Sequence, residues 1–325
     1  MAHKVVVTRE VFDDVLERLR AGATVVDNPS DRPLSPEELA ARAADADALV
    51  CALTDRIDDA LLARCPKLKV VANIAVGHNN IDLAACTARG VMATNTPGVL
   101  DETTADFAWA LMLGAARRVT EAERYLREGR WTGWQLKQLL GVDVHHATIG
   151  IIGMGRIGQA IARRAQGFSM SVLYCNRSRL DAETERSLNA RWVARDELLA
   201  AADFVVLMVP YSPATHHLIG AAELARMKPT AVLVNTARGG VVDDRALVEA
   251  LRRRTIAAAG IDVFEGEPAF DRDFLALDNV VLAPHIASSS AATRRGMAML
   301  AARNALCVLS GERPPNLLNP EAWKS

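Results

Sequence analysis

Short runs of β-branched and aliphatic residues alternate along the chain with longer stretches in which apolar positions recur at helical spacing. Runs such as VVLMV and AVLVN are almost continuously apolar, which is typical of parallel strands covered by helices on both faces. This alternation predicts an α/β protein with doubly wound parallel sheets. The predicted strands are residues 4–8, 48–53, 68–74, 148–152, 171–175, 204–209, 231–235, 257–262 and 280–283.

The distribution of these runs predicts two domains, as does a length of 325 residues. A helical stretch at residues 103–118 separates the strands before residue 100 from those after residue 147, and we interpret it as a spacer. After Pro284 the sequence is helix-forming without a further strand, so we expect this tail to return to the first domain or to bridge the two. We predict one domain from residues 1–101 and 286–325 and a second from residues 102–285.

Composition narrows the class of protein further. Lysine and arginine number 38 against 39 acidic residues, and they are scattered, so the charge pattern favours no nucleic-acid partner. The sequence shows no run of eighteen apolar residues and no leader-like start. Five cysteines form no CxxC pair, which fits a reducing compartment. We therefore expect a cytoplasmic protein without a membrane partner.

A glycine-rich turn at residues 153–158, GMGRIG, follows the strand TIGIIG and precedes the helical pattern QAIARRAQ. In this context Gly153 permits a tight turn, Gly155 allows the backbone to approach a pyrophosphate, and Gly158 allows close packing of helix on strand. Arg156 and Ile157 then begin the helix whose N-terminus faces the anion. The motif predicts a dinucleotide-binding site.

The next strand ends eighteen residues beyond Gly158, where an NAD-binding enzyme would present an acid to the ribose hydroxyls. Here the sequence has Asn176, Arg177, Ser178 and Arg179. Guanidinium and hydroxyl groups suit a 2′-phosphate, which a carboxylate would repel. We predict a preference for NADP(H), with NAD(H) as the alternative cofactor; the two arginines could also be exposed loop charges only.

Three polar residues follow strand-like runs in the second half of the chain: Arg238, Glu267 and His285. Each residue by itself is unremarkable at its position. Ligands of open α/β sheets bind at the carboxyl ends of the strands, so we expect all three side chains at one site.

The segments NIAVGHNNID, NTPGVL, GMGRIG, VNTARGGVVD, AAGIDVFEGEP and APHIASS resemble the D-isomer-specific 2-hydroxyacid dehydrogenases over nearly the whole chain. The stretch GVDVHHATIGIIGMGRIGQAIARRA is most similar to the glyoxylate/hydroxypyruvate reductase and 2-ketogluconate reductase branch. The resemblance implies a flavodoxin-like substrate domain, a Rossmann NAD(P)-binding domain and a homodimer.

The resemblance also implies roles for the polar residues. His285 would donate a proton to the substrate, Glu267 would orient the imidazole and keep it charged, and Arg238 would bind the carboxylate and keto oxygen of a 2-keto acid. Backbone N–H groups of Val76 and Gly77 would bind the same carboxylate from the opposite domain. Further positions implied to contact the cofactor are Thr104, Val209, Pro210, Thr215, Thr236 and Asp262, the last through the nicotinamide carboxamide.

Other features receive weaker interpretations. The pair His145-His146 lacks partners at metal-ligand spacing, so we predict no metal. Trp134 is a core or interface residue, with the alternative that it reaches a neighbouring subunit's substrate site. The sequence departs from the family at Ala287, where glycine is usual, and at Asp101, where threonine is usual.

These observations predict an NADPH-dependent reductase that converts glyoxylate, hydroxypyruvate or 2-ketogluconate to the D-2-hydroxy acid. One alternative is an NAD-dependent dehydrogenase of another D-2-hydroxy acid, such as phosphoglycerate. Another is a non-catalytic NAD(P)-sensing protein on the same fold. Turnover of a keto acid would distinguish the enzymes from the sensor.

Overall fold

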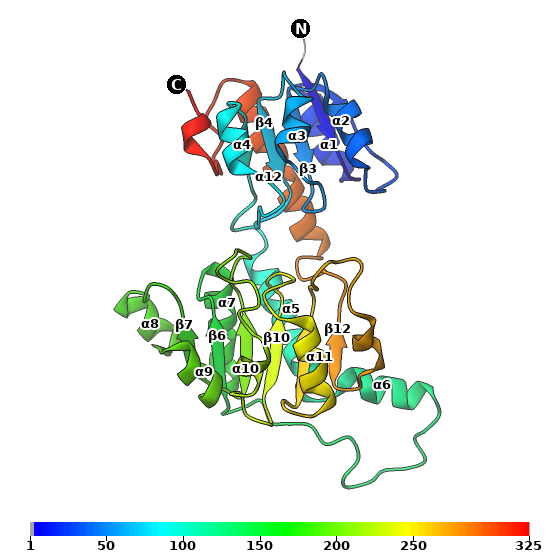
Figure 1. The fold of residues 1–325 in the computed structure, drawn as a ribbon, viewed down its shortest axis with the longest axis vertical. Coiled ribbons are helices and arrows are strands. Elements are labelled where there is room, and N and C mark those ends of the chain that lie inside the picture. Colours follow the sequence, from blue (N-terminus) through cyan, green and yellow to red (C-terminus); the bar gives the residue numbers. More distant parts are fainter. Residues whose placement is uncertain (1–2, 325) are drawn as a thin grey trace. The chain divides into compact units, whose positions relative to one another are not determined.

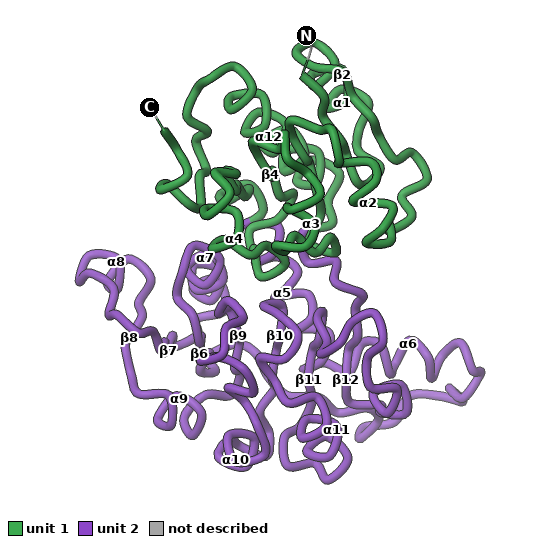
Figure 2. The backbone as a smooth tube through the Cα atoms, turned by 45° about the horizontal axis from the view of Figure 1, so that its top comes forward, with its two compact units in different colours: residues 1–100, 289–325 green, residues 101–288 purple. Residues whose placement is uncertain are grey.

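The computed structural model describes residues 3–324, and they form two compact units (Figure 2). The first unit contains residues 1–100 and 289–325, and the second contains residues 101–288. The predicted domain limits differ from these by one residue at the first boundary and three at the second. Figure 1 shows that the chain enters the second unit once and then returns to the first.

The first unit is built on a five-stranded parallel sheet in the order β2-β1-β3-β4-β5. This order is that of flavodoxin-like folds, in which the chain reverses direction across the sheet at its first strand. The strands are β1 (Lys4–Val7), β2 (Thr24–Val26), β3 (Ala48–Cys51), β4 (Val70–Asn73) and β5 (Met92–Thr94).

Helices cover both faces of this sheet. Successive strand residues point to opposite sides, so they pack against helices on different faces. Val5 and Val7 of β1 pack on one face, where the alanines of the C-terminal helix α12 (Ala291–Leu309) join them, and Val6 packs on the other. The tail after residue 288 thus belongs to the core of the first unit. The remaining helices are α1 (Asp13–Arg20), α2 (Pro36–Ala43), α3 (Asp59–Ala63), α4 (Leu83–Ala88) and the 3₁₀ turn η3 (Pro320–Ala322).

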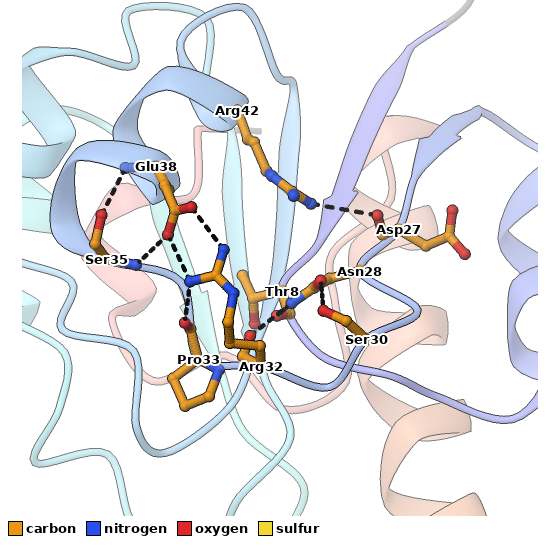
Figure 3. A network of polar contacts seen from close by, with 9 residues as sticks. All are labelled: Thr8, Asp27, Asn28, Ser30, Arg32, Pro33, Ser35, Glu38 and Arg42. Carbon is orange, nitrogen blue, oxygen red and sulfur yellow. Dashed lines mark hydrogen bonds and ion pairs between the residues drawn. The ribbon is translucent and has the colours of Figure 1, made fainter.

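Side-chain hydrogen bonds fix the loop between β2 and α2 (Figure 3). Asn28 donates to the carbonyl of Thr8 at 2.9 Å and to that of Arg32 at 2.8 Å. Ser35 caps α2 by accepting from the N–H of Glu38, and Glu38 accepts from the N–H of Ser35 and from the Arg32 guanidinium. The helix therefore begins with a capping box, which satisfies N–H groups that would otherwise lack partners.

The second unit is built on a seven-stranded parallel sheet in the order β12-β11-β10-β9-β6-β7-β8. Strands β6 to β8 run outward on one side and β9 to β12 on the other, so the topological switch lies between β6 and β9. The strands are β6 (Thr148–Ile152), β7 (Ser171–Cys175), β8 (Ala190–Trp192), β9 (Phe204–Leu207), β10 (Val232–Asn235), β11 (Ala258–Ile261) and β12 (Val280–Leu282).

Two apolar clusters cover the two faces of this sheet. Val232 and Val234 of β10 belong to one cluster, and Leu233 between them belongs to the other. The helices are α5 (Asp101–Ala116), α6 (Val119–Arg127), α7 (Arg156–Ala165), α8 (Ala182–Leu188), α9 (Arg195–Ala201), α10 (Ala221–Leu224) and α11 (Asp244–Arg252), with 3₁₀ turns η1 (Gln166–Phe168) and η2 (Arg272–Ala276). Figure 1 shows α6 and the chain after it projecting from the rest of the unit.

The predicted fold class, two doubly wound parallel α/β domains, is confirmed. Three edge strands, β2, β5 and β8, were missed because each has only three residues and one of the three is polar, whereas the equally short β12 is entirely apolar and was predicted. The interpretation of residues 103–118 as a spacer was wrong. Helix α5 packs in the core of the second unit, where Trp109 Nε1 donates to the carbonyl of Ile161 at 3.2 Å and Leu111 closely approaches Gly260.

Candidate active site

The three polar residues predicted to converge follow three neighbouring strands of the second unit. Arg238 follows β10, Glu267 follows β11 and His285 follows β12. Because parallel strands end at the same edge of a sheet, their loops meet there.

The imidazole of His285 is paired with a carboxylate. Its Nδ1 lies 2.5 Å from Glu267 Oε1, and the other carboxylate oxygen of Glu267 accepts from the N–H of Phe264 at 3.1 Å. Desolvation raises the pKa of the Glu267 carboxyl, but the hydrogen bond and charge of His285 and the N–H of Phe264 together hold it below its usual value. An ionised Glu267 accepts from Nδ1–H, so Nε2 is the nitrogen that can carry a transferable proton.

Arg238 is half-buried beside this pair. Burial lowers the pKa of its guanidinium, and the negative charge of Glu267 opposes that shift. One guanidinium N–H donates to the carbonyl of Ala237 at 2.7 Å. Since an arginine stays protonated even when partly desolvated, Arg238 presents a fixed positive charge within the field of Glu267.

Two residues that the sequence analysis did not select shape the Arg238 loop. The Asn235 side chain accepts from the N–H of Ala237 and donates to the carbonyl of Arg238, at 3.1 and 3.2 Å. A Cβ on Gly239 would lie 1.8 Å from the carbonyl oxygen of Phe264, so only glycine lets these two loops approach. An asparagine at a strand end is a known turn signal and could have been noticed; the Gly239 contact could not, because it joins distant segments.

Asp262 holds the His285 loop in place. Its side chain is fully buried, and its two carboxylate oxygens accept from the N–H groups of Ile286 at 2.7 Å and Ala287 at 2.9 Å. Its carbonyl accepts from the N–H of His285 at 2.8 Å. His285 itself has a φ of 54°, a left-handed conformation that is costly for a non-glycine residue. These three hydrogen bonds supply the restraint that such a backbone needs.

The glycine-rich turn has the geometry that a dinucleotide site requires. Gly153 has a φ of 104°, and a Cβ there would lie 2.5 Å from backbone atoms of Met208; a Cβ on Gly158 would lie 2.3 Å from the carbonyl oxygen of Gly153. At Gly155, by contrast, a Cβ would meet no atom within 4 Å. Helix α7 begins there without a side-chain cap, so its first N–H groups are available to a phosphate. Arg156 is exposed and Ile157 is half-buried at the start of this helix.

The four residues predicted to select the cofactor have different environments in the loop after β7. Asn176 accepts from the N–H of Met154 in the glycine-rich turn at 2.7 Å. Arg179 is bound through two N–H groups, at 2.9 and 2.7 Å, to Glu185, whose pKa the Arg179 hydrogen bond and that of Tyr174 lower to about 2. Arg177 and Ser178 are exposed.

Residues 109–287 match the model of the D-isomer specific 2-hydroxyacid dehydrogenase NAD binding domain, which covers more than half of the chain and nearly all of the second unit. The chain belongs to this family. The family predicted from sequence is therefore confirmed, and the protein is an NAD(P)-dependent oxidoreductase that acts on a CH–OH group of a small molecule.

This 2-hydroxyacid dehydrogenase is similar over its full length to several glyoxylate reductases. The chain is 48% identical to a glyoxylate reductase of Thermococcus gammatolerans, covering 100% of this chain and 98% of the relative. It is 49% identical to a glyoxylate reductase of Korarchaeum cryptofilum, over 100% and 98%. The crystal structure of an NADPH-dependent glyoxylate/hydroxypyruvate reductase from Sinorhizobium meliloti in complex with NADP and malonate superposes with a TM-score of 0.88 at 32% identity, over 100% and 99%.

Other positions predicted to contact the cofactor lie in the loops of this dehydrogenase's second unit or at their bases. Thr104 in α5 and Thr236 after β10 are buried. The Thr215 hydroxyl donates to the carbonyl of Pro210 at 2.7 Å and accepts from the N–H of Ser212, so it closes the loop after β9. In that loop Val209 is half-buried and Pro210 is exposed.

The remaining predicted substrate contacts lie in the first unit, in the turn after β4. The carbonyl of Val76 accepts from Asn95 at 2.8 Å and that of Gly77 accepts from Asn73 at 3.1 Å. Within residues 3–324 the N–H groups of Val76 and Gly77 donate to no protein acceptor. The turn is thus fixed through its carbonyls and leaves two adjacent N–H donors for a ligand.

None of the helices described between residues 3 and 324 is long and apolar enough to cross a bilayer.

Proposed function

We propose that this 2-hydroxyacid dehydrogenase is an NADPH-dependent reductase of small 2-keto acids, with glyoxylate and hydroxypyruvate as substrates and 2-ketogluconate as a third candidate. The observation that carries the proposal is the His285–Glu267 pair at 2.5 Å beside the partly desolvated Arg238. The names of the full-length relatives support glyoxylate as the first substrate to test. The product would be the corresponding D-2-hydroxy acid.

In this proposal the second unit holds the dinucleotide, at Gly153, Gly155 and Gly158 and the start of α7. The open space around Gly155 and the uncapped helix fit a pyrophosphate. When bound, the dinucleotide supplies the hydride that reduces the keto carbon.

The chain's own residues then act on the keto acid. Arg238 binds the substrate carboxylate and the keto oxygen, whose negative charge grows as the carbonyl is reduced. His285 donates its Nε2 proton to that oxygen, and Glu267 stabilises the imidazolium before transfer. The N–H groups of Val76 and Gly77, which donate to no acceptor among the described residues, are assigned to a substrate carboxylate. Electron pair and proton balance, since the carbonyl gains one hydride and one proton.

Arg177 is the residue to which we assign the 2′-phosphate of NADPH, with Ser178 as a second donor. Both side chains are exposed, whereas Arg179 is already bound to Glu185 by two hydrogen bonds. Asn176 stands where an acid would favour NADH, and its amide oxygen is used by the glycine-rich turn. Of the two arginines predicted to select the cofactor, only Arg177 is therefore assigned to the phosphate.

The substrate assignment is tested by NADPH consumption in a panel of glyoxylate, hydroxypyruvate, 2-ketogluconate and pyruvate. We expect the highest kcat/KM with glyoxylate or hydroxypyruvate and a lower value with pyruvate. No turnover of any of the four keto acids, with NADPH binding intact, would contradict a reductase and favour an NAD(P)-sensing protein.

We further propose that the protein forms a homodimer and that the arm formed by residues 119–140 is its interface. Six of the nine exposed large apolar side chains described in the chain lie in it, and Trp134 is 79% exposed. So large an apolar area in a segment that projects from its unit is typical of an interface. Light scattering should give twice the 35.1 kDa chain mass for the wild type and the chain mass for a Leu136→Glu, Leu140→Glu variant.

Trp134 offers a second measurement on the same arm. If it reaches a neighbouring subunit's substrate, Trp134→Ala should raise the KM for hydroxypyruvate while the protein stays dimeric. An unchanged KM would limit this residue to the interface.

A further inference from the structure

Two histidines and a glutamate outside the proposed reaction meet in the second unit. His216 and His217 lie in the loop between β9 and α10, and Glu265 lies in the loop after β11. One potential ligand atom from each of the three residues lies within 4.8 Å of the other two. Within residues 3–324 no other three histidine, cysteine or acidic residues are grouped in this way.

The backbone brings the two adjacent histidines to the same side. In an extended segment successive side chains point in opposite directions. His217 instead has a φ of 49°, and its N–H donates to the carbonyl of Gly240 at 2.8 Å. The two imidazole rings stack, with centroids 3.9 Å apart and an interplanar angle of 24°. A left-handed backbone occurs at nine non-glycine residues of the described chain, so at His217 it describes how the rings are placed and is not itself a sign of function.

Each imidazole has an outer partner at the same nitrogen. Tyr211 Oη lies 3.3 Å from His216 Nδ1, and an Asp243 carboxylate oxygen lies 3.9 Å from His217 Nδ1. Nε2 of each ring is therefore the nitrogen left for a ligand. On His217 it lies 2.9 Å from Glu265 Oε2. Metal-binding histidines commonly have a hydroxyl or carboxylate hydrogen-bonded to the nitrogen that does not face the metal, as Tyr211 is to His216. Asp243, at 3.9 Å, lies beyond hydrogen-bond distance of His217.

We propose that His216, His217 and Glu265 form a binding site for a divalent transition-metal ion, best matched by Zn²⁺, with water completing the coordination. Two nitrogens and one carboxylate oxygen suit zinc, and ligand atoms about 2.0–2.2 Å from the ion lie roughly 3.3–3.6 Å apart at a tetrahedral angle. The 2.9 Å between His217 Nε2 and Glu265 Oε2 would widen slightly on binding, and the His216 ligand atom, which lies within 4.8 Å of both, would move to the same spacing. Mg²⁺ and Ca²⁺ prefer oxygen ligands and fit this set poorly.

A bound ion would connect loops that also carry the proposed active site. Glu265 is two residues from Glu267 and its N–H donates to the buried carboxylate of Asp244 at 2.9 Å, while His217 is tied to Gly240, two residues after Arg238. The ion takes no part in the reduction. Its effect would be to cross-link the loops after β9 and β11.

The chain contains a matched control, the second histidine pair. His145 and His146 are also adjacent, and His146 likewise has a left-handed backbone with a φ of 62°, but their Nδ1 atoms lie 2.9 Å apart and contact each other. They belong to no group of three potential ligands among the described residues. Loss of this pair should leave specific zinc binding unchanged, so it corrects for nonspecific binding by surface histidines.

Calorimetric titration of untagged protein with ZnCl₂ tests the site. The wild type and the His145→Gln, His146→Gln double variant should each bind one equivalent of Zn²⁺ per chain with equal affinity. His216→Gln and Glu265→Gln should each weaken binding at least tenfold. Titration with MgCl₂ should show no saturable binding.

Two results would overturn the proposal. One is the absence of saturable zinc binding to the wild type; the other is an equal loss in the His145, His146 control and in the site variants. Glu265→Gln keeps the size and hydrogen-bonding reach of the side chain, so a folded variant is expected and far-UV circular dichroism verifies it. Co²⁺ offers an independent readout, because tetrahedral nitrogen and oxygen coordination gives an intense visible absorption that Glu265→Gln should abolish.

Discussion

The loops after β10, β11 and β12 differ from the loop after β7 in how the side chains with proposed functions are held. His285, Glu267 and Asp262 are joined by short hydrogen bonds, and Gly239 brings the Arg238 loop into contact with the Phe264 backbone. In the loop after β7, Asn176 and Arg179 are hydrogen-bonded, but Arg177 and Ser178 are exposed. Under the proposed function, the chemistry depends on fixed geometry, whereas cofactor choice depends on charge at a surface.

The largest expected effect is that of His285→Gln. Glutamine cannot supply the proton, so kcat for glyoxylate should fall about 100- to 10,000-fold. Fluorescence titration should show an unchanged Kd for NADPH, since the residue lies in a different loop from the cofactor turn. A kcat close to that of the wild type would show that another group donates the proton.

A smaller loss is expected for Asp262→Asn, which keeps the shape of the side chain. The new amide would place N–H donors against the N–H of Ile286 or Ala287, so one of two hydrogen bonds to the His285 loop is lost. We expect kcat to fall about 10- to 100-fold. The measurement is steady-state kinetics across pH. If only the thermal stability changed, Asp262 would support the fold without positioning His285.

The sequence could predict the residues of the candidate site but not the contacts that hold them. Arg238, Glu267 and His285 could be selected because each follows a strand and the family resemblance gave them roles. The contacts that fix them could not, since Gly239 with Phe264 and Asp262 with Ala287 join residues more than twenty positions apart. The pairing of Arg179 with Glu185 was missed for a different reason: an arginine's partner depends on side-chain direction, which a motif does not encode.

The His216, His217 and Glu265 group shows the same limit. The sequence contains two pairs of adjacent histidines, and only His145-His146 was considered as a metal site. The return of the chain through β11 brings Glu265 to His217, 48 residues away in the sequence, and no motif indicates this.

In the exposed loop, Arg177→Ala should act on one cofactor only. Loss of a charge-assisted contact to the 2′-phosphate should raise the KM for NADPH about tenfold or more and leave that for NADH unchanged. Arg179→Ala is the control from the same loop and should raise the KM for NADPH less. Equal effects of Arg177→Ala on both cofactors would refute the assignment.

The smallest effect on activity is expected for Arg179→Ala, which should instead alter stability in a pH-dependent way. The pKa of Glu185 is lowered to about 2 in the folded state, against about 4.3 in an unfolded chain. The Arg179–Glu185 pair therefore stabilises the fold above about pH 4.3, and this contribution disappears as pH falls toward 2. Urea unfolding should show the variant less stable at pH 7, with the difference shrinking below pH 4.3. A difference that stayed constant with pH would contradict the pairing.

The most direct test of the central claim is the ratio of kcat/KM for NADPH to that for NADH, measured on the wild type with glyoxylate as substrate. We expect this ratio to exceed about ten, because Arg177 is proposed to bind the 2′-phosphate, which only NADPH carries. His285 is proposed to act equally with either cofactor. A ratio of one or less, or no turnover with either cofactor, would contradict the account.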